Sequence, residues 1–327
     1  MRLHEDPRLF RQAAQFTADQ MRIPAIYVEK DYWVTYALRT IFESGIGADT
    51  VFKGGTALSK CYSMINRFSE DIDLVVLRRE GDSNNRLRTK IRTIGAVIEA
   101  ALPEVQIDGL THKMGMSRKT AHTYNRKFTG AYGQVRDVII VEATWLGYFE
   151  PYTTTFINSF VGSMMLSNGQ EKLAEDLGLT PFEVRVLEPI RTICEKIMSL
   201  VRFSYGEEPI SDLRKKIRHI YDLHQLLQQA EYSAFFNSGE FDQMLLRVGQ
   251  DDVASFKNNN GWLTNHPKDA LMFQDIEVVW KELREVYSGD FKNLVYADLP
   301  GEAEVVQTLG EIKKRLGTVE WSIKIPE

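Results

Sequence analysis

Hydrophobic and polar positions along the first 150 residues follow two spacings, one typical of helices and one typical of strands. Apolar side chains three or four positions apart predict helices, and short runs of β-branched and aliphatic residues predict strands. In chain order we expect helices at 5–21 and 27–43, a strand at 50–53, a helix from Thr56 to about 65, a strand at 71–77, a helix at 86–101 and a strand at 135–147. This alternation indicates an α/β-type core.

The second half of the chain is dominated by helical spacing. The expected elements there are helices at 168–177, 189–203 and 211–229, with polar loops at 204–210 and 250–268. A chain of 327 residues is typical of about two domains. We therefore expect one domain over residues 1–165 and a second, mainly helical domain over residues 166–327.

The composition is typical of a soluble globular protein, with 43% hydrophobic and 26% charged residues. No window approaches the ~18 apolar residues that a membrane-spanning helix needs, and the charged N-terminus is unlike a signal peptide. The two cysteines, Cys61 and Cys194, form no CxxC motif, and the histidines show no paired ligand spacing. These features predict a cytoplasmic protein without a structural zinc site.

The formal net charge of −5 argues against nucleic-acid binding only if the charge is spread evenly. Residues 1–165 hold 21 Lys and Arg against 18 Asp and Glu, a net charge of +3, and the remainder holds 19 against 27, a net charge of −8. The two halves therefore differ in sign, and the whole-chain value excludes little.

Two adjacent glycines, Gly54 and Gly55, separate an expected strand from the helix that follows it. Glycine lets the backbone turn sharply and approach a ligand, and free N–H groups at a helix start favour phosphate oxygens. Thr56 and Ser59 can add hydroxyl donors, and Lys60 can add a positive charge. The alternative is an ordinary strand–helix connection capped by Thr56. No Gly-Lys-Ser/Thr follows, so the segment is not a P-loop.

Three carboxylates are candidate metal ligands. Asp71 and Asp73 lie two positions apart on an expected strand, so they share one face about 7 Å apart, whereas Glu70 is expected to point away. Glu142 lies in an apolar strand, where a charge is costly unless it is paired or bound to metal. Oxygen ligands of this kind suit Mg²⁺ or Mn²⁺. The alternative is a solvated acidic face together with an edge-strand glutamate.

The helices of the second half contribute two further candidates. Lys196 flanks the apolar stripe of its helix, where its ammonium group can reach a phosphate or pair with a neighbouring acid. Asp222 lies one turn from Arg218, the spacing of a plain ion pair that contributes ~0.3–0.5 kcal/mol. Both a functional and a purely structural role remain open at this point.

Basic residues gather in two segments. Residues 112–127 contain five Lys and Arg, two His and no acid, with Tyr124 among them, and residues 214–218 contain four Lys and Arg. A mobile basic loop with an aromatic side chain suits phosphate backbones and base stacking. The alternative is a solvated loop.

Several segments together resemble the nucleotidyltransferase toxins of the AbiEii/MenT family, within the polymerase-β-like superfamily. The segments that carry the likeness are KGGTALSK (53–60), RFSEDIDL (67–74), VEKDYWV (28–34), VLEPIRTICEKI (186–197) and RHIYDL (218–223). The resemblance covers residues 27 to about 230. It implies an α+β fold with a polymerase-β-like core, a small mixed sheet flanked by helices, and a mainly helical C-terminal domain.

The resemblance also implies roles for individual residues. In the family the glycine turn and the following hydroxyl residue hold a nucleoside triphosphate, and the paired aspartates bind metal. A later lysine and aspartate are both needed for activity. The corresponding positions are Gly54, Gly55 and Thr56 for the triphosphate, Asp71 and Asp73 for metal, and Lys196 and Asp222 for the later pair. Glu142 matches the third carboxylate of the superfamily.

The function implied by the resemblance is Mg²⁺- or Mn²⁺-dependent transfer of NMP from an NTP to RNA, in particular a tRNA 3′ end. Release of pyrophosphate and a block of translation would follow, in a toxin–antitoxin or phage-defence system with a cognate antitoxin. The alternatives are a protein hydroxyl or an antibiotic as acceptor, a metal-dependent nuclease, or a non-enzymatic NTP-binding module. Ser69, two residues before Asp71, is either a surface serine or a position where phosphorylation would add charge beside the metal pair.

Overall fold

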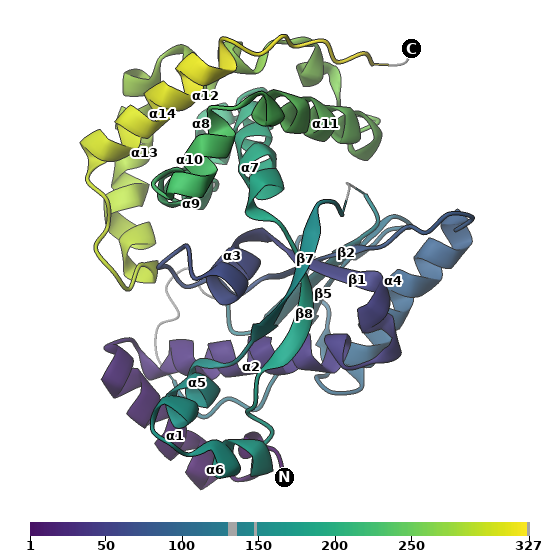
Figure 1. Cartoon of the computed structure of the whole chain (residues 1–327), viewed down its shortest axis with the longest axis vertical. Helices are drawn as coiled ribbons and strands as arrows, with labels where there is room; N and C mark the ends of the chain where they lie inside the picture. The colour runs from purple at the N-terminus through teal and green to yellow at the C-terminus, as the bar shows by residue number, and fades with distance from the viewer. Residues whose placement is uncertain (130–135, 147–148, 326–327) are drawn as a thin grey trace. The chain divides into compact units, whose positions relative to one another are not determined.

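The computed structural model describes residues 1–129, 136–146 and 149–325, and the chain divides into two compact units (Figure 1). The first unit comprises Met1–Ser63, Phe68–Trp145 and Tyr152–Val186, and the second comprises Met64–Arg67, Leu146–Pro151 and Leu187–Glu327. The first unit continues past residue 165 because its last strand joins the sheet. Among the described residues, no helix is long and apolar enough to cross a membrane.

A single mixed sheet forms the centre of the first unit, and its described strands run in the order β3-β5-β6-β2-β1-β8-β7, with β4 paired to β5. The strands are β1 (Thr50–Lys53), β2 (Ile72–Val76), β3 (Glu104–Val105), β4 (His112–Lys113), β5 (Ser117–His122), β6 (Ile139–Thr144), β7 (Tyr152–Ile157) and β8 (Phe182–Leu187). Strand β2 pairs antiparallel with β1 and parallel with β6, and β5 pairs antiparallel with β6. These four strands carry the candidate site.

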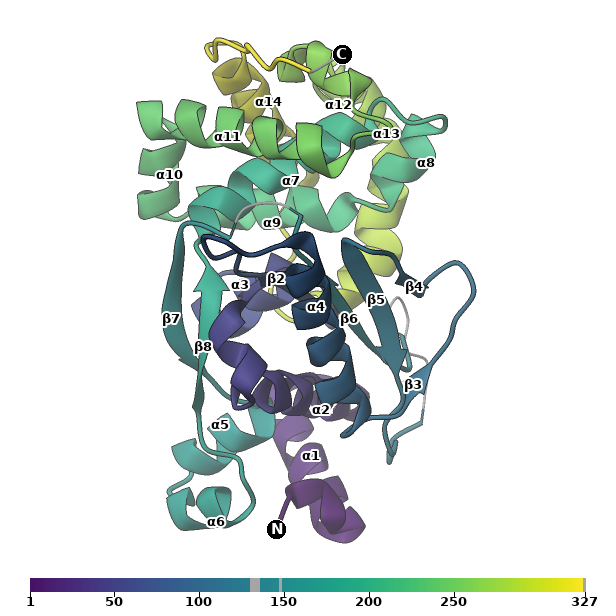
Figure 2. The same cartoon turned by 90° about the vertical axis from the view of Figure 1, so that its right-hand side faces the viewer.

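Helices cover the apolar face of this sheet (Figure 2). The helices of the first unit are α1 (Pro7–Met21), α2 (Ala25–Phe42), α3 (Gly54–Tyr62), α4 (Asn84–Glu99), α5 (Phe160–Ser167) and α6 (Glu171–Asp176), with 3₁₀ turns at Leu3–Glu5 and Gly45–Asp49. Ile72, Leu74 and Val76 of β2 pack into one core with apolar residues of α2 and α4. Alternate residues of a strand point to opposite faces, so Asp73 lies on the other face of the sheet.

The second unit is mainly helical. Its helices are α7 (Pro189–Phe203), α8 (Pro209–Arg214), α9 (Ile217–Leu227), α10 (Ala230–Phe236), α11 (Gly239–Ser255), α12 (Leu271–Gln274), α13 (Ile276–Val286) and α14 (Glu302–Leu316), with short helical turns at Gly261–Thr264, Pro267–Asp269, Tyr287–Phe291 and Lys292–Leu294. The apolar stripe expected on the helix at 189–203 is buried, including Ile193, Ile197 and Leu200. The expected α+β fold, with a mixed sheet flanked by helices, is confirmed.

Three expectations about local structure are wrong. The helix after the double glycine begins at Gly54 rather than after Thr56. Residues 112–122, expected as part of a loop, form the β4–β5 hairpin. The helix expected at 211–229 is divided into α8 and α9. For the hairpin, contacts with a distant segment outweigh the local pattern, because β5 pairs with β6 along its whole length.

Candidate active site

A row of charged side chains crosses the sheet on the face opposite α2 and α4. Strand register places Asp73 beside Lys53 on one side and Glu142 on the other, and it continues through Lys119 to His112. Residues directly opposite each other on neighbouring strands point to the same face. We call these five residues the charged row. It brings two of the predicted metal ligands, Asp73 and Glu142, onto adjacent positions.

Asp73 is the most perturbed carboxylate of the charged row. Burial raises its pKa to about 7, with further contributions from the carboxylates of Glu142 and Asp71, against the opposing effect of Lys53 and Lys119. The group therefore lies where negative charge is in excess. Such a surplus favours a cation at this point of the sheet.

Gly54 makes close contact with the Asp73 carboxylate. Its φ of +81° is in the left-handed region, and a Cβ built at this position would lie 2.3 Å from Oδ2 of Asp73. Any other residue would therefore collide with the carboxylate in addition to straining the backbone. The start of α3 and the aspartate are held together by this fit.

The other two carboxylates of the group are each bound to a cation. Oε2 of Glu142 lies 3.0 Å from Nζ of Lys119, and Oδ1 of Asp71 accepts a hydrogen bond of 3.4 Å from Arg136. Among the described residues, no three His, Cys, Asp or Glu side chains are arranged to hold a metal ion. The donor chemistry nevertheless fits Mg²⁺ or Mn²⁺, because all three groups are carboxylates, and repulsion from Glu142 and Asp71 adds to the effect of burial in raising the pKa of Asp73. Metal binding by these residues stays a prediction.

The predicted nucleotide-binding residues on α3 divide by exposure. Gly54, Gly55 and Ser59 are half-buried, whereas Thr56 is buried. The Thr56 hydroxyl donates to the carbonyl oxygen of Asp71 at 2.6 Å and lies 2.9 Å from the hydroxyl of Ser69. Thr56 therefore connects the first turn of α3 to the segment that leads into β2.

Lys60 lies in a different environment from the one expected for a phosphate ligand. Its ammonium group forms a buried ion pair with Asp31 of α2 and also donates to the carbonyl oxygen of Asn158 at 3.4 Å. The same Asp31 accepts a hydrogen bond of 2.7 Å from the backbone N–H of Phe160. In this arrangement Lys60 fixes α3 against α2, and a role in nucleotide binding stays a prediction.

Three consecutive charged residues of α2, at positions 29–31, are buried although they face different neighbours. Glu29 accepts hydrogen bonds from the backbone N–H groups of Lys127 and Phe128 at 2.6 and 3.2 Å. Lys30 is fully buried and donates to the carbonyl oxygens of Arg136 and Val138. Together with Asp31, they anchor three separate segments to one helix.

Glu70 is the partner of Lys30, and it was expected only to point away from the aspartate pair. Its carboxylate lies 3.2 Å from Nζ of Lys30 and accepts bonds of 2.9 and 3.1 Å from the N–H of Arg136. Burial lowers the pKa of Lys30 and raises the pKa of Glu70, while each partner opposes the shift of the other. The pair fixes the residue that precedes Asp71. The sequence offered one signal for this pair, namely that an acid and a base, Glu29 and Lys30, lie among apolar residues of α2.

Lys196 and Asp222 lie together in the second unit. Nζ of Lys196 donates to Oδ2 of Asp222 at 2.7 Å, and Arg67 donates from Nε and Nη2 to both carboxylate oxygens, each at 2.7 Å. All three residues are buried. Burial alone would raise the pKa of Asp222, but the two cations hold it far below its usual range. We call these three residues the buried cluster.

Arg67 was not selected from the sequence, although it precedes the aspartate pair in RFSEDIDL. It belongs to the short segment Met64–Arg67, which is grouped with the second unit. The backbone of Arg67 forms an isolated bridge with Val295, and Tyr296 N–H donates to the carbonyl oxygen of Asn66 at 3.0 Å. The segment between α3 and β2 is thus held at several points within the second unit.

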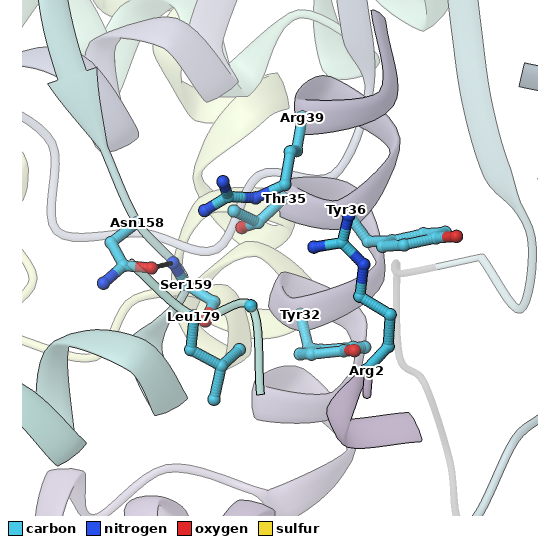
Figure 3. A pocket seen from close by; sticks show the side chains of 9 residues that line it. Arg2, Tyr32, Thr35, Tyr36, Arg39, Asn158, Ser159 and Leu179 are labelled. Atoms are coloured by element: carbon cyan, nitrogen blue, oxygen red, sulfur yellow. Dashed lines mark hydrogen bonds between the residues drawn. The ribbon is translucent and has the colours of Figure 1, made fainter. Parts of the chain in front are cut away.

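A small cavity lies next to α2 in the first unit (Figure 3). Its volume is about 20 Å³, room for one water molecule rather than a nucleotide. The figure shows Arg2 and Arg39 beside it, and Nδ2 of Asn158, which borders it, is buried without a hydrogen-bond partner in the described part of the chain. An ordered water would satisfy this amide, and the cavity is separate from the charged row.

Comparison with known protein families gives a match. The sequence model of a family described as nucleotidyl transferase AbiEii toxin, Type IV TA system, matches residues 36–310. The matched range contains every residue of the charged row, the turn at Gly54 and the buried cluster, and it begins after positions 29–31. No curated protein matches the chain at a significant level.

Proposed function

Because the chain belongs to the family of nucleotidyl transferase AbiEii toxins of Type IV toxin–antitoxin systems, we propose that it transfers NMP from an NTP to an RNA acceptor. The proposed acceptor is a tRNA 3′ end, with release of pyrophosphate and a block of translation. Family membership implies transferase activity, a nucleotide substrate and an antitoxin counterpart. The observation that carries the proposal is the contact between the helix-opening Gly54 and Asp73, beside Glu142.

In the proposed reaction, the first turn of α3 binds the triphosphate through its free backbone N–H groups. The hydroxyl of Thr56 is occupied by the carbonyl of Asp71, so Thr56 contributes its backbone and fixes the turn. Asp71, Asp73 and Glu142 would hold Mg²⁺ or Mn²⁺, which when bound polarises the α-phosphate and neutralises the departing pyrophosphate. Ser59 is a further candidate contact for the phosphates. Lys196 belongs to the second unit, where it donates to Asp222, and its contact with phosphate stays a prediction.

The acceptor hydroxyl attacks the α-phosphorus, a new phosphoester bond forms, and the bond to the β-phosphate breaks. The hydroxyl proton passes to a carboxylate of this chain, for which Glu142 is the better candidate. Asp222 is a poor base, because both its oxygens accept hydrogen bonds from cations and its pKa is far below neutral. We therefore assign Asp222 the role of positioning Lys196 and Arg67.

The test is to incubate total RNA with each α-labelled NTP in the presence of Mg²⁺ and to resolve the products on a sequencing gel. We expect one or two NTPs to label RNA of tRNA size in a ribonuclease-sensitive band. Asp73→Asn should lose the label, and Asp19→Asn, an exposed position on α1, should keep it. Label that follows protein and survives ribonuclease, or RNA shortening without NTP, would refute the proposal in favour of another acceptor or a nuclease.

A further inference from the structure

The charged row continues past the carboxylates into the β4–β5 hairpin. We propose that this hairpin, with the neighbouring exposed face of α4, binds the phosphate backbone of the RNA acceptor. We call this surface the acceptor surface, and it includes residues on both faces of the hairpin. His112 and Lys119 share the face of the charged row, whereas Lys113 and Arg118 point to the other face, beside α4, which adds Arg88 and Arg92. The inference rests on the proposed function, because it identifies where the acceptor of that reaction lies.

Strand geometry connects the hairpin to the reacting groups. Lys119 of β5 is opposite Glu142, and His112 of β4 is opposite Lys119, all on the face that carries Asp73. Neighbouring strands lie about 4.8 Å apart, and the two spacings from β5 over β6 to β2 separate Lys119 from Asp73 by roughly 10 Å. An RNA end whose hydroxyl lies at the carboxylates therefore has its next phosphates within reach of Lys119 and His112.

Hydrogen bonds hold the tip of the hairpin to the strand that carries Glu142. The carbonyl oxygen of Met116 accepts from the hydroxyl of Thr144 at 3.0 Å and from the N–H of Trp145 at 3.3 Å. The ring of His112 lies 3.4 Å from the hydroxyl of Ser117 across the hairpin. The tip therefore has a fixed position relative to β6, as a surface that guides a substrate toward Glu142 requires.

Positive charge continues around the hairpin turn onto α4, which covers the sheet face opposite the charged row. A Cβ built at Gly115 would lie 3.3 Å from Nε of Arg88, so this guanidinium lies against the hairpin turn. Arg92 follows one helical turn later, and both arginines are exposed and have no acidic partner in the described part of the chain. Lys113 and Arg118, in contrast, share the single carboxylate of Glu104 at 2.7 and 3.0 Å.

The charge balance and the exposed groups favour RNA as the occupant. Four cations at positions 88, 92, 113 and 118 are balanced by one carboxylate, whereas the chain as a whole has a net charge of −5. Met114 and Met116 at the turn are 71% and 40% exposed, flexible apolar side chains that suit contact with a base. A surplus of cations over acids matches a phosphate backbone, which is contacted independently of sequence.

The decisive variant is the double substitution Arg88→Gln with Arg92→Gln, because both side chains are exposed and their loss leaves the core intact. Its matched control is Arg8→Gln with Arg11→Gln on α1, which also removes two exposed helical arginines. Binding of bulk tRNA without NTP is measured by fluorescence anisotropy at several salt concentrations. NMP transfer is measured in parallel, with KM for RNA, KM for NTP and kcat determined separately.

We expect the double variant on α4 to bind tRNA several-fold more weakly and to raise KM for RNA, with kcat and KM for NTP unchanged. The slope of log K against log salt should become shallower by about 0.7 to 0.9 for each phosphate that the variant no longer neutralises. The control on α1 should behave as the wild-type protein does. Adding Lys113→Gln to the α4 variant should weaken tRNA binding further.

Equal tRNA affinity and equal salt slope in the wild-type protein and the α4 variant would overturn the acceptor surface, while continued NMP transfer would leave the proposed function intact. Absence of NMP transfer by the wild-type protein would refute the proposed function, and the binding experiment would still decide about the surface. A third outcome would assign the surface to a protein partner and overturn the inference. In that case an acidic protein binds the wild-type protein, Met114→Ser abolishes this binding, and the α4 variant keeps its full tRNA affinity.

Discussion

Asp73 in the charged row and Asp222 in the buried cluster are both aspartates that the sequence points to, and they lie in opposite electrostatic surroundings. Burial and the neighbouring carboxylates raise the pKa of Asp73 to about 7. Burial would also raise the pKa of Asp222, but Arg67 and Lys196 reverse that effect and hold it far below its usual range. At Asp73 the opposing effect of Lys53 and Lys119 is smaller than that of burial and the carboxylates, whereas at Asp222 the two cations outweigh burial.

This difference indicates which aspartate takes part in chemistry and which supports structure. A carboxylate that shares its surroundings with two others gains from a bound cation or proton, as expected of a site that binds metal and substrate. A carboxylate whose two oxygens already accept three hydrogen bonds from cations gains little from a proton or a metal ion. Loss of activity on substitution would therefore have different causes at the two positions.

The strongest test of the comparison is Asp73→Asn. We expect NMP transfer to fall by about a thousandfold, within the range typical of a lost acid–base or metal-binding group. The folded pKa is above the unfolded value, so ionisation of Asp73 lowers stability as pH rises from about 4 to 7. The variant should therefore melt higher than the wild-type protein in EDTA at pH 8, by on the order of 2 °C.

At pH 4 that difference in melting temperature should disappear, because Asp73 is then protonated in the folded wild-type protein. Mg²⁺ should raise the melting temperature of the wild-type protein and leave that of the variant unchanged. A variant that melts lower than the wild-type protein at pH 8 would contradict the excess of negative charge in the charged row.

The second test is Asp222→Asn, which leaves Arg67 and Lys196 buried without their counter-charge. Removal of one partner from a buried ion pair costs about 3–5 kcal/mol, and we expect a loss of this size in the free energy of unfolding by urea. The matched control is Asp212→Asn, whose partner Lys215 is exposed, with an expected loss below about 1 kcal/mol.

The pH dependence of this loss has a defined sign. The folded pKa of Asp222 is lowered, so its contribution is present above about pH 4 and is lost as pH falls further. The difference between the variant and the wild-type protein should therefore be constant from pH 5 to 8 and shrink below pH 4. A stable, inactive Asp222→Asn protein would show that Asp222 acts directly in the reaction.

The contrast between the two aspartates also shows what the sequence could predict. The helix at 189–203 matches α7 at both ends, and the strand at 50–53 matches β1, because local periodicity and a proline in the first turn define them. The surroundings of Asp222 could not be predicted, since Arg67 is 155 positions away in sequence. Local spacing suggested Arg218 as its partner instead.

Non-local pairing accounts for the other differences. Buried and more exposed residues alternate along β8 because it pairs with another strand of the sheet. That partner, β1, lies more than a hundred residues earlier in the sequence. The hairpin at 112–122 is rich in basic residues, which hid its strands, because pairing with β6 decides its conformation. Positions 29–31 contact several distant segments, and only the presence of charges in a buried helix indicated them.

The third test examines an intermediate case, the pair of Lys30 and Glu70. Glu70→Gln keeps the shape of the side chain and removes the charge that compensates a fully buried ammonium group. We expect a loss of about 1.5–3 kcal/mol in the free energy of unfolding, the range for hydrogen bonds to charged groups. Glu80→Gln, at an exposed position, is the control and should change stability by less than about 0.5 kcal/mol.

Activity distinguishes this pair from the two aspartates. Glu70 precedes Asp71 and holds the N–H of Arg136, which in turn contacts Asp71. A displaced Asp71 should lower kcat at saturating NTP and raise the Mg²⁺ concentration needed for half-maximal rate. An unchanged Mg²⁺ dependence would mean that the pair stabilises the fold without positioning the metal ligand.

The smallest expected effect is that of Thr56→Val, which separates the two roles of the α3 turn. The substitution keeps the side-chain shape and removes the hydroxyl that donates to the carbonyl oxygen of Asp71, at a cost of about 1 kcal/mol in stability. If the hydroxyl only connects α3 to β2, KM for NTP should stay the same. Ser69→Ala, which removes the other hydroxyl of the pair, should then have a similar or smaller effect. A rise in KM for NTP in Thr56→Val alone would show that the hydroxyl leaves the carbonyl oxygen of Asp71 to bind phosphate. The α3 turn would then act together with the charged row, as a group that changes its hydrogen-bond partner during the reaction.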